Sequence, residues 1–284
     1  MRFVTFKNGT NVEAGVMMGG QVFGLAGAGF HSVLSVIEGG ADAMDRVTRW
    51  VQHTPANEEP DMEDIQLRAP IPRPAKVICI GLNYRDHAEE ARLPIPEVPT
   101  VFAKFRTAIT GAGQPIILPK NSEKVDYEAE FALVIGRRGR HIKAADWQKY
   151  VFGYTMMNDV SARDFQMATS QWTMGKTFDT FAPLGPEVVT TDEIEDPQNL
   201  DISLTLNGQV MQKSNTSQMI FGIPRLIEFL SSVFTLEPGD IIATGTPAGV
   251  GFARKPPVWL KAGDSVTVRV HGLGELTNPV VAEA

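Results

Sequence analysis

Hydrophobic and polar positions alternate with period two over many short segments of the chain, and this pattern predicts β-strands. Near the N-terminus, two hairpin turns are expected at Asn8-Gly9 and Gly19-Gly20, between short β-prone runs. Asn and Gly accept the positive φ that two-residue hairpin turns require. The chain therefore begins with a small β-rich unit.

A helix and then a proline-rich connection follow this unit. Apolar positions recur at helical spacing over residues 31–52, and the pair Gly39-Gly40 is expected to split that helix. Residues 53–75 are rich in proline and acidic residues, and proline disfavours helix in the residue before it. We therefore interpret residues 1–70 as a small N-terminal domain and residues 71–284 as the main domain.

The main domain contains many short predicted strands and few helices. A hairpin is expected within residues 201–212, with its turn at Asn207-Gly208. The clearest helix covers residues 223–234, and its apolar stripe is formed by Leu226, Phe229, Leu230 and Val233. This mixture indicates an α+β domain built on a sheet sandwich or roll.

One predicted strand, VDYEAEFALVIG, carries three carboxylates on one face. Period two places Tyr127 and the odd-numbered apolar residues on one side, and Asp126, Glu128 and Glu130 on the other. Carboxylates so close repel one another, so either solvent covers them at an edge or a divalent cation binds between them. Asp159, after a later apolar run, offers a third oxygen ligand. An all-oxygen site suits Mg²⁺, Mn²⁺ or Ca²⁺ better than Zn²⁺.

Composition excludes several classes of protein. The net charge of −7 argues against sequence-independent nucleic-acid binding, which requires neutralised phosphates. The single cysteine, Cys79, excludes an internal disulfide framework and a Cys-rich zinc site, and is expected in the core. No apolar run reaches the ~18 residues of a membrane span, and the start lacks the long apolar stretch of a signal peptide. We therefore expect a cytoplasmic protein, although a processed protein of the mitochondrial matrix would look the same.

Six ordered motifs resemble the fumarylacetoacetate hydrolase superfamily, from about residue 70 to the C-terminus. They are VICIGLNYRDHAEEA, DYEAEFALVIG, GYTMMNDVSARDFQ, GKTFDTFAPLGP, LNGQVMQKSNTSQMIF and GDIIATGTPAGVG. Within the superfamily the chain is similar to the "domain-containing" members of the animal mitochondrial type. The resemblance implies a mixed β-sandwich roll with a small N-terminal β-rich domain, usually in a homodimer.

The resemblance also implies roles for particular residues. The E-x-E motif and the downstream Asp imply that Glu128, Glu130 and Asp159 bind Mg²⁺ or Mn²⁺, with Asp126 behind them or in solvent. The implied catalytic residues are His87, Glu90, Lys176 and Gln166, and the implied substrate-binding residues are Thr246 and Arg163.

Simpler interpretations exist for several of these residues. His87 and Glu90 are three residues apart, so a short helix would place them on one face. There they are either a base with its orienting carboxylate or part of a solvated surface. Lys176 has the alternative of an ordinary surface lysine. We expect Arg163 to pair with Asp164, and Trp172 to be either a pocket wall or core.

The implied function is metal-dependent chemistry on a 2-keto acid. The first interpretation is a hydrolase that breaks a C–C bond in an acylpyruvate or related 2,4-diketo acid through a metal-stabilised enolate. The alternative is an oxaloacetate decarboxylase, or a keto–enol tautomerase or isomerase of a 2-oxo dicarboxylate. A third class, a metal-binding homologue without catalysis, is disfavoured because the implied ligands and Lys176 are all present.

Overall fold

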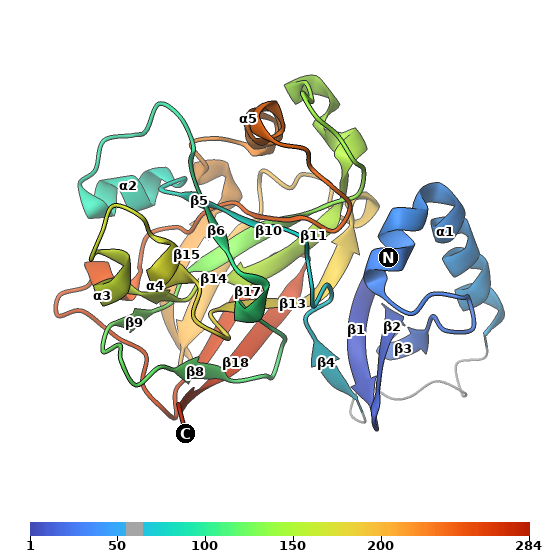
Figure 1. The fold of residues 1–284 in the computed structure, drawn as a ribbon, viewed down its shortest axis with the longest axis horizontal. Helices are drawn as coiled ribbons and strands as arrows, with labels where there is room; N and C mark the ends of the chain where they lie inside the picture. The colour runs from blue at the N-terminus through green and yellow to red at the C-terminus, as the bar shows by residue number, and fades with distance from the viewer. Residues whose placement is uncertain (55–64) are drawn as a thin grey trace.

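The computed structural model describes residues 1–54 and 65–284, and two β-sheets dominate it (Figure 1). The larger sheet has eleven strands. Along its main path lie β3 (Gln21–Gly24), β2 (Asn11–Met18), β1 (Arg2–Asn8), β13 (Ala182–Thr190), β11 (Val151–Asn158), β10 (Ala129–Ile135), β16 (Ile241–Ala243), β5 (Val77–Gly81) and β6 (Thr100–Lys104). Off this path, β4 (Gln66–Arg68) pairs with β1, and β7 (Ile109–Thr110) pairs with β13.

A second sheet packs against the first. Its strand order is β15 (Gln209–Asn215), β14 (Asp201–Leu206), β17 (Ser265–Val270), β18 (Gly274–Ala282) and β8 (Ile116–Leu118), and a small sheet pairs β9 (Val125–Asp126) with β12 (Ser161–Ala162). Strands β10 and β11 contact β17, and β10 also contacts β14. Most pairs are antiparallel, but β5–β16, β7–β13 and β8–β18 are parallel. The expected mixed α+β sandwich is confirmed.

Helices cover the sheets at opposite sides of the molecule. They are α1 (Val33–His53), α2 (Arg85–Ala91), α3 (Arg163–Gln166), α4 (Thr173–Lys176) and α5 (Ile223–Val233). Short 3₁₀ helices are η3 (Arg106–Ala108), η4 (Ala144–Tyr150), η5 (Thr191–Glu193), η6 (Thr216–Gln218) and η7 (Gly251–Ala253). Figure 1 shows α1 beside the N-terminal strands at one side, and α2, α3 and α4 together at the other. No described helix combines the length and apolar character of a membrane span.

Strand β10 is buried on both of its faces. Its odd-numbered residues, such as Phe131 and Leu133, lie in the core between the two sheets, as the alternation predicted. Its even-numbered residues Ala132 and Val134 lie in a second core with α1 and the N-terminal strands. The acidic face therefore does not belong to a solvated edge, and that alternative is wrong.

The N-terminal elements agree with the sequence pattern. Both predicted hairpins form: the second turns at Gly19-Gly20 as expected, whereas the first turns at Gly9-Thr10, one residue later than predicted, because Asn8 pairs with Asn11. Helix α1 has a non-helical residue at Gly40, where φ is 58°. Strand β1 pairs with β13, so the N-terminal strands continue the large sheet of the main domain. The boundary at residue 70 stays a prediction, and residues 55–64 of the predicted connection lie outside the described residues.

Two of the later predicted elements are also present. The hairpin of β14 and β15 turns at Asn207-Gly208, as expected. Helix α5 forms, but Val233 is 64% exposed because the helix ends there, and Phe229 is only partly buried. The buried face of α5 is formed instead by Ile223, Leu226, Ile227 and Leu230.

Gly153 allows β11 to lie close to β13. A Cβ at this position would lie 2.3 Å from the backbone oxygen of Val189.

We expect Gly153→Ala to lower the free energy of unfolding by about 1–3 kcal/mol, because backbone rather than a flexible side chain would have to move. Urea denaturation measures this, with the exposed Val210→Ala as the control. Equal stability of the two variants would contradict the proposed close approach.

Candidate active site

Three buried carboxylates meet where β10 begins and β11 ends. The antiparallel pairing of Ala129 with Asn158 places Asp159 beside Glu128, and the Asp159 N–H donates to the Glu128 carbonyl over 2.8 Å. Each of Glu128, Glu130 and Asp159 offers an oxygen, and these oxygens lie within 4.8 Å of one another. All three side chains are at most 5% exposed. The structure thus brings together the three residues that the sequence suggested as metal ligands.

Two buried lysines neutralise part of this negative charge. Lys176 Nζ lies 2.7 Å from Glu128 Oε2 and 2.7 Å from Asp159 Oδ2, so Lys176 is not a surface lysine. Burial lowers the pKa of Lys176, but Asp159 and Glu128 outweigh it and raise the pKa above its ordinary value. Lys104 Nζ lies 2.7 Å from Asp159 Oδ1 and also donates to the carbonyls of Val160, Lys176 and Phe181.

Arg163 is the third buried cation. It pairs with Asp126 Oδ2 through Nη2 at 2.7 Å and with Glu128 Oε1 at 2.6 Å. The expected Arg163–Asp164 pair is wrong, because Asp164 accepts hydrogen bonds from Ser122 Oγ and the Glu123 N–H. Asp126 is fully buried rather than in solvent, and it also accepts from the N–H groups of Tyr127, Gly251 and Phe252.

Gln166 and Thr246 are oriented by other side chains. Gln166 Oε1 accepts from Arg163 Nη1 over 2.8 Å, so its Nε2 remains a donor. Thr246 Oγ1 accepts from Gln212 Nε2 over 2.8 Å, so its hydroxyl proton remains available. Gln212 Oε1 in turn accepts from the Ala129 N–H, between the two glutamates of β10. Gln212 therefore holds Thr246 at a fixed place relative to the carboxylates.

His87 and Glu90 lie on one face of α2, as their spacing predicted. His87 Nδ1 lies 3.3 Å from Glu90 Oε2, and Glu90 also accepts from the Gly249 N–H over 3.0 Å. Burial raises the pKa of Glu90, but the hydrogen bonds from His87 and Gly249 outweigh it, and the net pKa is lowered. Gly249 has φ of 103°, and a Cβ there would lie 2.1 Å from the Met211 oxygen, so this position requires glycine.

Eight of the nine site residues predicted from the sequence line one small cavity, and the exception is Glu90. The cavity has a volume of about 150 Å³. Its charged end contains the carboxylates, and its apolar walls include Leu93, Phe102, Met167, Trp172, Val250 and Phe252. Trp172 is therefore a pocket wall, in edge contact with Phe102 at 5.5 Å between ring centroids.

The chain matches the fumarylacetoacetate (FAA) hydrolase C-terminal family over residues 76–281. The chain belongs to the fumarylacetoacetate hydrolase family. Members are enzymes, among them hydrolases, isomerases and tautomerases, and the family binds divalent metal.

Individual relatives extend this comparison. The chain is 53% identical over 220 residues to "Oxaloacetate tautomerase FAHD2A, mitochondrial" from Bos taurus, covering 77% of this chain and 70% of the relative. It resembles fumarylacetoacetate hydrolase from psychrophilic Exiguobacterium antarcticum with a TM-score of 0.87 and 34% identity over all of both chains. Maleylpyruvate hydrolase from Sphingobium sp. SYK-6, solved with manganese(II) ion and pyruvate, gives a TM-score of 0.85 and 29% identity, also over all of both chains.

The buried charges of this family member fit a divalent cation. The site contains four buried carboxylates, Asp126, Glu128, Glu130 and Asp159, and three buried cations, Lys104, Arg163 and Lys176. Glu130 is the one of these four that forms no ion pair among the described residues, and the Gly245 N–H donates to its Oε2 over 2.8 Å. Burial raises the pKa of Glu130 well above its ordinary value, and the charges of Asp159 and Glu128 add to this shift. A divalent ion bound here would offset the unpaired negative charge.

Two residues of the site were missed by the sequence reasoning, Lys104 and Gln212. Lys104 stands in the strand TVFAKF, and a lysine in a mostly apolar strand is a weak signal that it has a buried partner. Gln212 follows a hairpin turn and gives no local signal. Both act through partners more than 30 positions away in the chain, so only the fold reveals them.

We expect Lys104→Met to lower the free energy of unfolding by about 3–5 kcal/mol, because it leaves part of the Asp159 charge buried without its partner. Urea denaturation with EDTA present measures this without a contribution from metal. The matched control is Lys149→Met, which removes an exposed lysine paired with Asp146, and it should leave stability unchanged. Equal effects of the two substitutions would contradict a buried ion pair at Lys104.

Glu130→Gln should affect stability in opposite directions with and without metal. In EDTA the variant should be at least as stable as the wild type, because it replaces a buried carboxyl group that forms no ion pair with a neutral amide. Saturating Mg²⁺ at 100 times its Kd should stabilise the wild type by about 2.7 kcal/mol, and the variant much less. Calorimetry should show Mg²⁺ affinity reduced at least ~10-fold, with the exposed Glu123→Gln unchanged. Unaltered affinity in Glu130→Gln would exclude this residue as a ligand.

Proposed function

We propose that the chain is a divalent-metal-dependent keto–enol tautomerase that acts on oxaloacetate or a similar small 2-oxo dicarboxylate. The observation that carries the proposal is the carboxylate triad of Glu128, Glu130 and Asp159 in the same small cavity as His87. The name of the Bos taurus relative supports the choice of reaction. This proposal adopts the alternative interpretation of the sequence in place of the acylpyruvate hydrolase.

Glu128, Glu130 and Asp159 would hold the metal. Their hard oxygen ligands suit Mg²⁺ first, with Mn²⁺ as the next choice and Ca²⁺ also compatible. When bound, such an ion supplies Lewis-acid stabilisation of negative charge on a keto-acid oxygen. A bound ion would favour the ionised form of Glu130, which forms no ion pair among the residues described and whose pKa is raised well above its ordinary value.

His87 would carry the proton in tautomerisation. Glu90 accepts from Nδ1, which leaves Nε2 as the basic nitrogen. Nε2 would take a proton from C3 of the keto form as the C2–C3 double bond forms, and a proton from water would go to the C2 oxygen. The imidazolium then gives its proton to the hydroxide left by that water, which regenerates water and neutral His87, so the cycle is balanced. Glu90 stabilises that imidazolium while it exists.

The remaining side chains would hold the substrate. Lys176 stays charged and places a positive group beside two carboxylates of the triad. Gln166 Nε2 and the Thr246 hydroxyl are the neutral donors that line the cavity. Arg163 also lines it, with its guanidinium already bound to Asp126, Glu128 and Gln166, and substrate contact by Arg163 stays a prediction.

The cavity volume favours a small substrate. About 150 Å³ is well below the 300–1,000 Å³ of typical drug-sized pockets, and it suits a four-carbon acid better than a long acylpyruvate. Hydrolysis remains the second candidate, because the same His87–Glu90 pair can activate water and because the Sphingobium hydrolase was solved with manganese and pyruvate. Decarboxylation of oxaloacetate would use the same ligands.

The setting of the enzyme is also a proposal. Free, buried Cys79 is compatible with a reducing compartment, either the cytoplasm or the mitochondrial matrix, and the Bos taurus relative is called mitochondrial. The partner we propose is a small 2-keto acid, with no role for nucleic acid or a membrane surface. The homodimer implied by the resemblance is retained as a proposal.

The reaction is tested by product analysis. With Mg²⁺, the protein should accelerate the interconversion of enol and keto oxaloacetate, followed by the ultraviolet absorbance of the enol, and EDTA should abolish the acceleration. Release of CO₂ from oxaloacetate and of pyruvate from an acylpyruvate should be slower. If either of these exceeds tautomerisation, the corresponding decarboxylase or hydrolase replaces our proposal.

His87→Asn should lower kcat by about 10²–10⁴, because the proton carrier is lost, while calorimetry shows unchanged Mg²⁺ affinity. The control is His141→Asn, at an exposed position with φ of 53° that Asn adopts readily. Full tautomerase activity in His87→Asn would exclude His87 as the proton carrier without affecting the assignment of the metal ligands.

A further inference from the structure

The loop that follows β16, residues 244–254, connects the cavity with helix α2. Three of its side chains line the cavity, those of Thr246, Val250 and Phe252. Between them, the Gly249 N–H donates to both carboxylate oxygens of Glu90, over 3.0 Å to Oε1 and over 3.1 Å to Oε2. The orientation of Glu90 therefore depends on one peptide group of this loop.

Gly249 does not fix the direction of this N–H by itself. Glycine has the widest choice of backbone conformations, and its φ of 103° here lies in a region that other residues rarely adopt. The Gly249 carbonyl accepts from Arg254 Nε over 3.3 Å and from Tyr127 Oη over 3.3 Å. The peptide groups on both sides of the Gly249 Cα are thus held, one by Glu90 and the other by these two donors.

Arg254 also ties the loop to strand β15. Its Nη2 donates to the Met211 carbonyl over 2.5 Å, and the next residue of that strand, Gln212, donates to the Pro247 carbonyl over 2.8 Å. A planar guanidinium has donors that point in different directions, so Arg254 reaches the carbonyls of Gly249 and Met211 together. The middle of the loop is therefore fixed between α2 and an edge strand of the smaller sheet.

The charge of Arg254 acts on Glu90 as well. Burial raises the pKa of Glu90, but the hydrogen bonds from His87 and Gly249 lower it, the charges of His87 and Arg254 add to that effect, and the net pKa is lowered. An ionised carboxylate is a stronger hydrogen-bond acceptor than a neutral one. Arg254 thus favours the form of Glu90 that binds His87.

We propose that Arg254 is a positioning residue for His87. It fixes the Gly249 peptide, this peptide orients Glu90, and Glu90 accepts from His87 Nδ1, which leaves Nε2 to take the proton. Arg254 is not among the described residues that line the cavity, so it acts through these groups rather than on the substrate. The inference rests on the proposed function in one respect, that His87 is the proton carrier.

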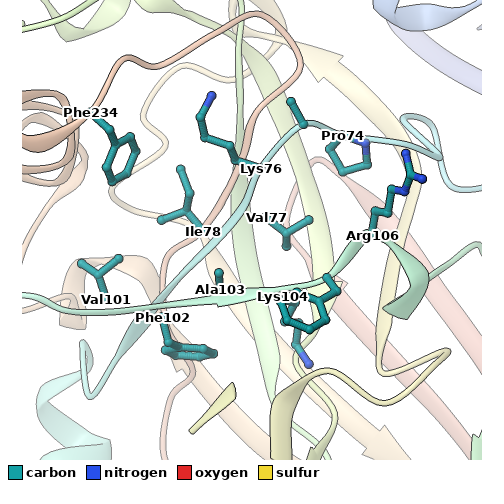
Figure 2. Close-up of a pocket in the computed structure, with 12 residues that line it drawn as sticks. Pro74, Lys76, Val77, Ile78, Val101, Phe102, Ala103, Lys104, Arg106 and Phe234 are labelled. Carbon is teal, nitrogen blue, oxygen red and sulfur yellow. The ribbon is translucent and has the colours of Figure 1, made fainter. Parts of the chain in front are cut away.

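The carboxylate triad is held by other contacts. The Gly245 N–H, at the start of the loop, donates to Glu130, and Lys104 pairs with Asp159. Figure 2 shows Lys104 extending from β6, which belongs to the larger sheet. A substitution at Arg254 should therefore displace His87 and leave the Mg²⁺ affinity unchanged.

The first test is steady-state tautomerase kinetics with Mg²⁺. Arg254→Met should lower kcat about 10–100-fold with little change in KM, because the proton carrier is misplaced while the substrate contacts remain. Arg254→Lys, which keeps a charged donor near the Gly249 carbonyl, should recover part of the loss. The matched control is Lys255→Met, at the exposed neighbouring position, and it should behave as the wild type. An unchanged kcat in Arg254→Met, or a kcat loss accompanied by an equal loss of Mg²⁺ affinity in calorimetry, would overturn the proposal.

The second test is a double-mutant cycle with Glu90→Gln. If Arg254 acts through Glu90, then Arg254→Met should lower kcat by less than about twofold once Glu90 has been replaced. A merely structural role of Arg254 would give the same loss in both backgrounds. That result would reject the proposed route from Arg254 to His87.

The third test needs no turnover. Long-range ¹H–¹⁵N spectra show which ring nitrogen of a neutral histidine carries the proton, and His87→Asn identifies the signals of His87. The wild type should hold His87 mainly as the Nδ1–H tautomer, and Arg254→Met should increase the Nε2–H form. Equal tautomer populations in the two proteins would overturn the proposal. If the protein does not tautomerise oxaloacetate, the proposed function fails, and these spectra still decide whether Arg254 positions His87.

Discussion

Four carboxylates are buried together at the ends of β10 and β11, and only three cationic side chains are buried with them. Burying charge is costly unless each charge is paired, so the arrangement of these seven groups constrains the surrounding structure. Glu128 has two cationic neighbours, and they lower its pKa to about 2 although burial alone would raise it. Glu130 forms no ion pair among the described residues, and its pKa moves in the opposite direction. The site thus contains one buried carboxyl group that no cationic side chain of these residues pairs with.

Each sheet contributes an edge strand that supports one part of the site. From the larger sheet, β6 directs Lys104 to Asp159 and places Phe102 against Trp172, so it fixes the charged end and one wall. In the smaller sheet, Gln212 of β15 donates a hydrogen bond to Thr246, and Ser214 of the same strand donates one to Asp86 of α2. The carboxylates and the proposed proton carrier are therefore held by different layers of the sandwich.

The sequence pattern predicted what depends on local periodicity. The two faces of β10, the N-terminal hairpins and the His87–Glu90 pairing all follow from spacings of two or three residues, and all are present. Errors arose where distant segments decide the environment. The acidic face of β10 continues into a second core, because Ala132 and Val134 pack in a cluster shared with α1 and the N-terminal strands, and nothing in the strand itself indicates that cluster. Val233 keeps helical spacing but lies where α5 ends.

The same distinction explains why the pairing of Arg163 was predicted wrongly. Asp164 is its neighbour in sequence, but adjacent residues on a short helix point in different directions and do not face each other. The fold offers Asp126, which already accepts three backbone N–H groups, and Arg163 can bind this carboxylate and Glu128 together. A guanidinium with several fixed donors suits that position better than an ammonium group would. The proposed ligand Glu128 is therefore held from behind by Arg163, which is itself fixed by Asp126, 37 positions away in the chain.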